Sequence, residues 1–138
     1  MKNNMPTVPH VFPVALQAQR DAARIGFDWP DISGALDKVE EEAHELRTAL
    51  AAGDEIHAAR ELGDLLFAAV NVARFLNVDP DQCLEGTTCR FQERLEIVKK
   101  IAAERQLSLA SCTLEALDGL WEEAKQLMHQ QLEKGLDK

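Results

Sequence analysis

Residues 61–76 read ELGDLLFAAVNVARFL, and this stretch indicates the fold class. The segment is apolar around most of its circumference when it is drawn as a helix, so it belongs inside a bundle and not on its surface. At about 100° per residue, Asp64, Ala68 and Asn71 share one narrow stripe, and Glu61 lies beside it. The expected core face on the other side consists of Leu62, Leu65, Leu66, Ala69, Ala73 and Leu76. The polar side chains are therefore gathered on one side of an apolar helix.

A second acidic group, EEAHE at 41–45, precedes this segment. Glu42 and Glu45 are three residues apart and project from the same face of a helix, where like charges repel each other. The expected core stripe of this helix is Leu36, Val39, Ala43, Leu46 and Leu50, and the separate polar stripe is Lys38, Glu42, Glu45 and Ala49. Antiparallel packing of the two helices would bring both acidic groups together. In an apolar setting these carboxylates require a cation, and hard oxygen ligands suit magnesium or manganese.

The alternative reading of the first acidic group is an ordinary solvated helix face. That reading fits Glu40, which we interpret as surface charge. It does not fit the second group, because an acidic pair at the start of a nearly all-apolar helix has no solvated face to occupy.

Helical periodicity along the chain predicts an all-α class and a compact helical bundle. We expect helices at 13–25, from a Ser33 cap to 51, from a turn at 52–54 to 76, from an Asp79 cap to 105, and after a Thr113 cap. The segment 86–88, GTT, weakens the first turns of the fourth helix. One domain is expected over residues 7–133, with flexible termini at 1–6 and 134–138. The apolar third helix favours a homodimer or higher homo-oligomer that completes the core.

The composition narrows the classes of function. A formal charge of −9 over 138 residues argues against nucleic-acid binding through a general basic surface. The three cysteines, Cys83, Cys89 and Cys112, have no zinc-ligand spacing and are expected to be reduced. No stretch approaches the length that crosses a bilayer, and the first residues do not resemble a signal peptide. The sequence therefore predicts a cytoplasmic protein that binds neither nucleic acid nor membrane.

With these motifs in view, the chain resembles the MazG family of nucleoside triphosphate pyrophosphohydrolases, whose pattern is EExxE followed after a spacer by ExxD. The resemblance extends to GFDWPD at 26–31, LDKVEEE at 36–42, RFQER at 90–94 and LWEEAK at 120–125, and matches the C-terminal catalytic domain. It implies an all-α fold, usually dimeric, that uses magnesium to hydrolyse a nucleoside triphosphate to the monophosphate and pyrophosphate. Manganese could replace magnesium.

The resemblance also implies roles for individual residues. Glu42, Glu45, Glu61 and Asp64 match the metal ligands, and Glu41 is either a further ligand or the carboxylate that orients the attacking water. The matching nucleotide-contact positions are Lys38, Arg90, Arg94 and Trp121, to which we add Asn71 as a substrate-binding candidate from its place on the polar stripe. This chain has Thr88 and Arg90 where relatives have asparagine and lysine.

The other readings of these substrate-binding candidates are structural. Arg90 and Arg94 could form a solvated face, Trp121 could be a core residue, and Asn71 could satisfy a buried backbone group.

The residues support a mechanism in which water attacks the α-phosphorus and pyrophosphate leaves. We expect Glu41 or a neighbouring carboxylate to accept the proton of the water. We expect Arg90 and Arg94 to hold the triphosphate and to stabilise the charge that develops on pyrophosphate. Two alternatives for the whole protein stay open. One is a non-catalytic helical module that binds metal and serves assembly. The other is a related pyrophosphohydrolase restricted to one deoxynucleotide or to a phosphoribosyl-ATP intermediate.

Overall fold

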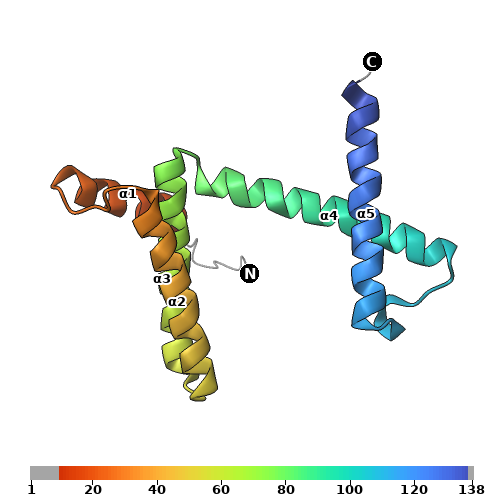
Figure 1. Cartoon of the computed structure of the whole chain (residues 1–138), viewed down its shortest axis with the longest axis horizontal. Coiled ribbons are helices and arrows are strands. Elements are labelled where there is room, and N and C mark those ends of the chain that lie inside the picture. Colours follow the sequence, from red (N-terminus) through yellow and green to blue (C-terminus); the bar gives the residue numbers. More distant parts are fainter. Residues whose placement is uncertain (1–9, 137–138) are drawn as a thin grey trace, which may run out of the picture. The chain divides into compact units, whose positions relative to one another are not determined.

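The computed structural model describes residues 10–136, and these form helices and connecting loops without a strand. The elements are α1 (Val11–Arg24), α2 (Ile32–Ala51), α3 (Glu55–Leu76), α4 (Pro80–Glu104), the short 3₁₀ helix η1 (Leu109–Ser111) and α5 (Leu114–Leu136), shown in Figure 1. The predicted all-α class is confirmed. No helix in this part of the chain has the length and apolar character needed to span a bilayer.

The helix ends follow from local capping chemistry. The Asp31 side chain accepts a hydrogen bond from the Ser33 backbone at 2.8 Å, so the cap of α2 is Asp31 and the prediction of Ser33 is wrong by two residues. The predicted caps Asp79 and Thr113 are confirmed, because they accept hydrogen bonds from the backbones of Asp81 and Ala116. α4 is continuous through the GTT segment at 86–88.

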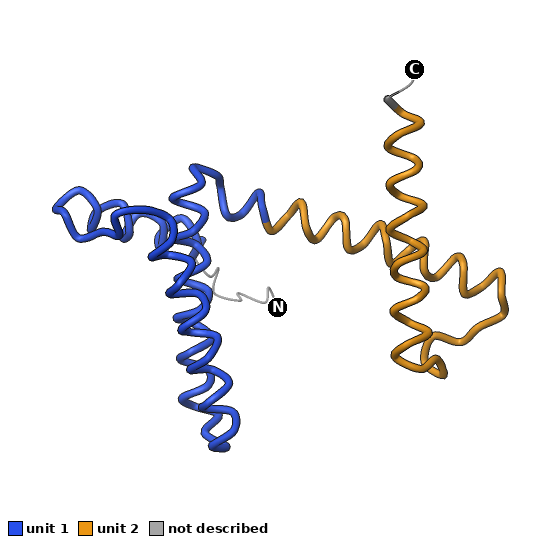
Figure 2. The backbone as a smooth tube through the Cα atoms, viewed as in Figure 1, with its two compact units in different colours: residues 1–83 blue, residues 84–138 orange. Residues whose placement is uncertain are grey.

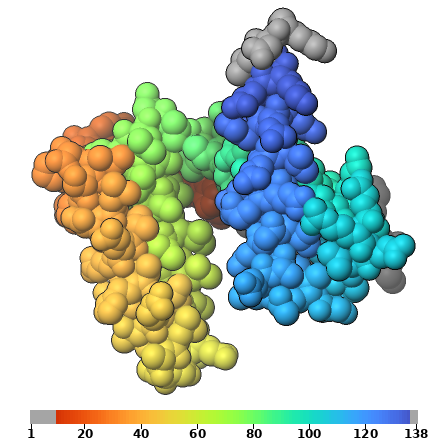
Figure 3. All heavy atoms as spheres, turned by 45° about the vertical axis from the view of Figure 1, so that its right-hand side comes forward, coloured from red at the N-terminus to blue at the C-terminus, as the bar shows by residue number. Residues whose placement is uncertain are grey.

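The chain divides into two compact units, residues 1–83 and 84–138 (Figure 2). In the first unit α2 and α3 run side by side, and in the space-filling view they form a continuous column of atoms (Figure 3). The turn that connects them contains Gly53, whose φ is 72°. α1 also packs on α3, and Gln19 Nε2 donates to the Phe67 carbonyl at 2.9 Å. The second unit contains most of α4, together with η1 and α5. Its buried cluster is Val98, Ile101, Leu120 and Ala124.

The expectation of one domain over residues 7–133 stays a prediction. α5 continues through residues 134–136, which the sequence placed in a flexible terminus. The other residues of the two expected termini, 1–6 and 137–138, lie outside the described part.

Small and acidic residues form the contact between α2 and α3. The buried residues of the two helices are Ala35, Glu42 and Ala49 on α2, and Ala58, Glu61, Ala68, Val70 and Ala73 on α3. Alanine lets two helix backbones approach closely, and this brings the carboxylates of opposite helices within reach of each other. Most of the leucines expected in the core lie outside this contact. Leu36, Leu50, Leu62, Leu66 and Leu76 are each between 47 and 60% exposed, so their assignment to the core of a single chain is wrong.

Candidate metal and nucleotide site

Three carboxylates converge at the middle of the α2–α3 pair. Glu42 and Glu45 come from α2 and Glu61 comes from α3, and each offers an oxygen within 4.8 Å of the others. The predicted convergence of the two acidic groups is therefore confirmed for these three residues.

Two of these carboxylates are buried and only half satisfied. Glu42 is 4% exposed and Glu61 is 6% exposed. Lys38 Nζ lies 3.0 Å from Glu42 Oε1, and His57 Nε2 lies 3.0 Å from Glu61 Oε1. The second oxygen of each carboxylate, Oε2, is buried and has no hydrogen-bond partner among the described residues.

Buried polar atoms nearly always have a partner, so two orphaned carboxylate oxygens side by side require an explanation. A bound cation supplies one. The donor set consists of oxygen atoms alone, which fits magnesium or manganese better than a softer metal.

The pKa values of the carboxylates also favour a cation at this position. The adjacent Glu42 carboxylate, burial and the nearby Glu45 raise the pKa of Glu61 to about 7. The Lys38 ammonium lowers the pKa of Glu42, and Glu42 in turn raises the pKa of Lys38. Adjacent carboxylates cannot all ionise cheaply without a cation, so one of them keeps a proton. A divalent cation would replace that proton.

The remaining acidic candidates lie outside the group of three. Glu41 is exposed, and its Oε1 lies 3.3 Å from Lys38 Nζ. Asp64, one turn after Glu61, lines a neighbouring cavity together with Glu42. The roles of Glu41 and Asp64 stay predictions. Glu40 is exposed on α2, as expected for surface charge.

The neighbouring cavity has a volume of about 850 Å³ and lies within the first unit. Its polar and aromatic lining residues are Gln19, Phe27, Asp28, Trp29, Lys38, Glu42, Asp64, Asn71 and Arg74. The predicted substrate-binding residues Lys38 and Asn71 both lie on its wall.

Hydrogen bonds hold two of the side chains that line this cavity, Arg74 and Gln19. Arg74 donates to Asn71 Oδ1 at 2.8 Å and to Asp28 Oδ2 at 3.1 Å, and this contact lowers the pKa of Asp28. Gln19 is 6% exposed and uses its amide nitrogen for the Phe67 carbonyl, which leaves its buried Oε1 without a hydrogen-bond partner in residues 10–136. Gln19 therefore contributes a buried polar group to the wall of the cavity.

The sequence reading missed Gln19, Trp29 and Arg74 as residues of this cavity. The available signal was the aromatic segment FDW at 27–29, which lies between the first two expected helices. Trp29 remains 44% exposed, and its ring lies over Gly34.

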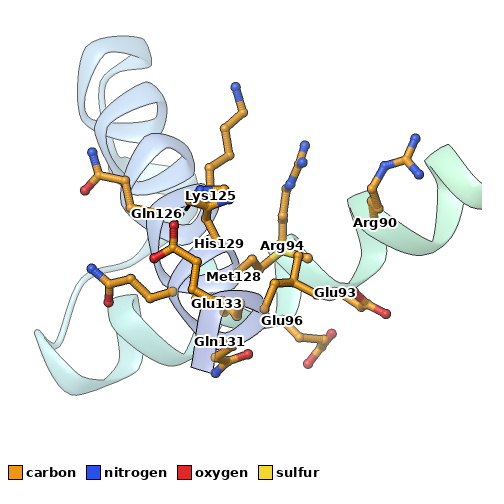
Figure 4. A pocket seen from close by; sticks show the side chains of 13 residues that line it. Arg90, Glu93, Arg94, Glu96, Lys125, Gln126, Met128, His129, Gln131 and Glu133 are labelled. Carbon is orange, nitrogen blue, oxygen red and sulfur yellow. Dashed lines mark ion pairs between the residues drawn. The ribbon is translucent and has the colours of Figure 1, made fainter. Parts of the chain in front are cut away.

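The second unit holds the other predicted nucleotide contacts. Arg90 and Arg94 of α4 and Lys125 of α5 line a groove of about 1250 Å³. Figure 4 shows their cationic ends extending to the same side of the groove, while Glu93 and Glu96 point to the other side. Arg94 Nε is buried without a partner in the described residues.

Trp121 of α5 packs against Phe91 of α4. Its ring centroid is 5.4 Å from that of Phe91, and the Arg94 guanidinium carbon is 5.7 Å from its ring. The indole is partly buried against the core of the second unit. Packing thus accounts for part of the Trp121 surface, and its contact with a nucleotide stays a prediction.

Comparison with known proteins agrees with the motif reading. A family model described as phosphoribosyl-ATP pyrophosphohydrolase matches residues 18–90. Over 120 residues the chain is 41% identical to the nucleoside triphosphate pyrophosphohydrolase/pyrophosphatase MazG of Thermotoga maritima, an alignment that covers 87% of this chain and 46% of that protein. It is also 33% identical to the nucleoside triphosphate pyrophosphohydrolase of Escherichia coli K12 over 123 residues, which are 86% of this chain and 47% of the relative.

These matches confirm the resemblance to MazG that the sequence motifs indicated. The chain spans about half the length of the curated relatives it matches.

Proposed function

Because the chain belongs to the phosphoribosyl-ATP pyrophosphohydrolase family, we propose that it hydrolyses nucleoside triphosphates to nucleoside monophosphates and pyrophosphate with the help of magnesium or manganese. The relatives that match most of the chain carry the name nucleoside triphosphate pyrophosphohydrolase, and this favours a triphosphate as the substrate.

The pair of orphaned oxygens on Glu42 and Glu61 carries this proposal. A structural ion pair would leave both carboxylates satisfied, and a solvated acidic face would leave them exposed. Two buried carboxylates with one free oxygen each, and Glu45 within 4.8 Å, instead form a set of ligands.

The proposed chemistry assigns a task to each group. When bound, a divalent cation lowers the pKa of water, polarises phosphoryl oxygens and offsets the charge on pyrophosphate. Glu42, Glu45 and Glu61 hold the cation, and Asp64 is a further ligand. Lys38 keeps Glu42 ionised and oriented. Glu41, which is accessible on the same helix face as Lys38, accepts the proton of the attacking water.

The nucleoside is proposed to enter the cavity beside the carboxylates. Trp29 offers a half-exposed ring on which a base can stack. Replacing Trp29 with alanine should raise KM about tenfold and change kcat little, because stacking on one base is worth roughly 1–3 kcal/mol. A fall in kcat at constant KM would contradict this placement.

Arg90 and Arg94 are the proposed phosphate contacts of the second unit. Guanidinium groups bind phosphate oxygens through paired hydrogen bonds, and the groove that contains them also carries Lys125. Converting Arg94 to lysine keeps the charge but removes the fork of donors. We therefore expect this variant to lose affinity for the triphosphate but to keep its metal affinity.

A nucleotide panel with magnesium tests the function. The panel contains the common ribo- and deoxynucleoside triphosphates and phosphoribosyl-ATP, and the products are scored as pyrophosphate or as single phosphate. We expect pyrophosphate from triphosphates, lost by about 100-fold or more in Glu42→Gln and retained in Glu40→Gln, the matched exposed carboxylate on α2.

Other outcomes of the panel distinguish the alternatives. Turnover of phosphoribosyl-ATP alone, or of one deoxynucleotide alone, would restrict the proposed substrate. Metal binding without any turnover would favour the non-catalytic module.

A further inference from the structure

Each buried carboxylate of the group lies close to a basic side chain four residues earlier on its own helix. On α2, Lys38 Nζ lies 3.0 Å from Glu42 Oε1, and on α3, His57 Nε2 lies 3.0 Å from Glu61 Oε1. The free oxygen of both carboxylates is Oε2. The two helices thus repeat one arrangement, in which one carboxylate oxygen lies beside a basic side chain and the other has no partner in the described residues.

His57 is placed for this contact by the start of α3. Its backbone N–H donates to the Asp54 side chain at 3.0 Å, so the helix cap fixes the residue in the first turn. The His57 side chain is 54% exposed and the Glu61 side chain only 8%. The imidazole therefore reaches from the solvent side to a buried oxygen.

We propose that His57 is a positioning residue of the metal centre, which holds Glu61 Oε1 so that Oε2 faces the cation. The inference deepens the proposed function and rests on it. His57 does not belong to the set of ligand atoms within 4.8 Å of one another, so it acts through Glu61 and not as a ligand. Outer partners of this kind orient the ligands of a metal, and their loss typically costs about 10- to 100-fold in affinity.

The described part of the chain contains a matched pair outside the group of three carboxylates. On α5, His129 Nε2 lies 3.2 Å from Glu133 Oε1 with the same spacing of four residues, and both side chains are well exposed, at 75% and 66%. Exposed pairs of this type contribute little. Burial of Glu61 beside Glu42 distinguishes the α3 pair from the α5 pair.

The experiment is titration calorimetry of the full chain with Mn²⁺ alone. The variants are His57→Ala, His57→Gln and the control His129→Ala. We expect affinity to fall about tenfold in His57→Ala and to be largely restored in His57→Gln, because the glutamine amide can donate to the same oxygen. The control should bind as the wild type does. Thermal unfolding in EDTA shows whether a variant has lost fold stability instead.

Two results overturn the inference in different ways. Equal Mn²⁺ affinity in His57→Ala and the wild type, or an equal loss in His57→Ala and His57→Gln, removes the positioning role but leaves the proposed function standing. Absence of Mn²⁺ binding to the wild type overturns the proposed function and this inference with it.

Discussion

Glu61 is the residue whose protonation most directly reports on the site. Its pKa in the folded protein is about 7, above the ordinary value of 4.5, chiefly because of Glu42 and burial. Between these two values the folded chain binds a proton that the unfolded chain has released, so the free energy of unfolding decreases as the pH rises through this window. Below pH 4.5 the lowered pKa of Glu42 acts in the opposite direction.

We therefore predict that in EDTA the stability contributed by Glu61 is lost between about pH 4.5 and 7. Denaturant unfolding at pH 5, 6 and 7 measures this slope. Glu61→Gln, which cannot ionise, should be nearly independent of pH over the same range, and millimolar Mg²⁺ should restore most of the loss in the wild type. A wild-type stability that stays constant over this range without metal would contradict the raised pKa of Glu61.

At the scale of the element, the first turn of α2 positions the aromatic wall of the cavity. A Cβ added to Gly34 would lie 2.7 Å from two ring atoms of Trp29, which is closer than Cβ atoms approach other heavy atoms in proteins. Gly34→Ala should therefore displace the indole, although alanine is otherwise the better helix residue by roughly 0.5–1 kcal/mol.

This prediction has a control in the same chain. We expect Gly34→Ala, made in a Trp121→Phe background, to shift the Trp29 fluorescence to longer wavelength and to weaken nucleotide binding. Gly119→Ala on α5 meets no atom within 4 Å and should only stabilise the helix. Unchanged fluorescence and affinity in Gly34→Ala would show that Trp29 does not depend on the close approach.

Local sequence rules predict the helices and their ends, but not the cavity between them. Short-range rules located all five α-helices, the caps Asp79 and Thr113, and the convergence of Glu42 with Glu61, because each depends on residues a few positions apart or on a single helix pair. The cavity could not be predicted in this way. Gln19 meets α3 through tertiary packing, which periodicity within one segment does not report.

At the scale of the whole molecule, the assignment of the α2 and α3 leucines to the core of one chain is wrong for a related reason. Periodicity correctly identified an apolar face, but it could not say which surface covers that face. Alanine and glutamate occupy the contact between α2 and α3, and the leucines of these helices remain about half exposed. Exposed apolar patches of this kind often mark an interface between protein chains.

We predict that two copies of the chain associate through the leucines of α2 and α3. The wild type should sediment at about twice the 15.4 kDa of one chain. Because a buried unpaired charge is costly, Leu62→Glu and Leu66→Glu should each shift the equilibrium towards the monomer by about tenfold or more. Leu114→Glu, a charge at the 76% exposed leucine that begins α5, serves as the control and should leave the equilibrium unchanged. A wild type that stays monomeric at all concentrations, or equal effects of the three substitutions, would contradict this assignment and would leave the apolar face to a different partner.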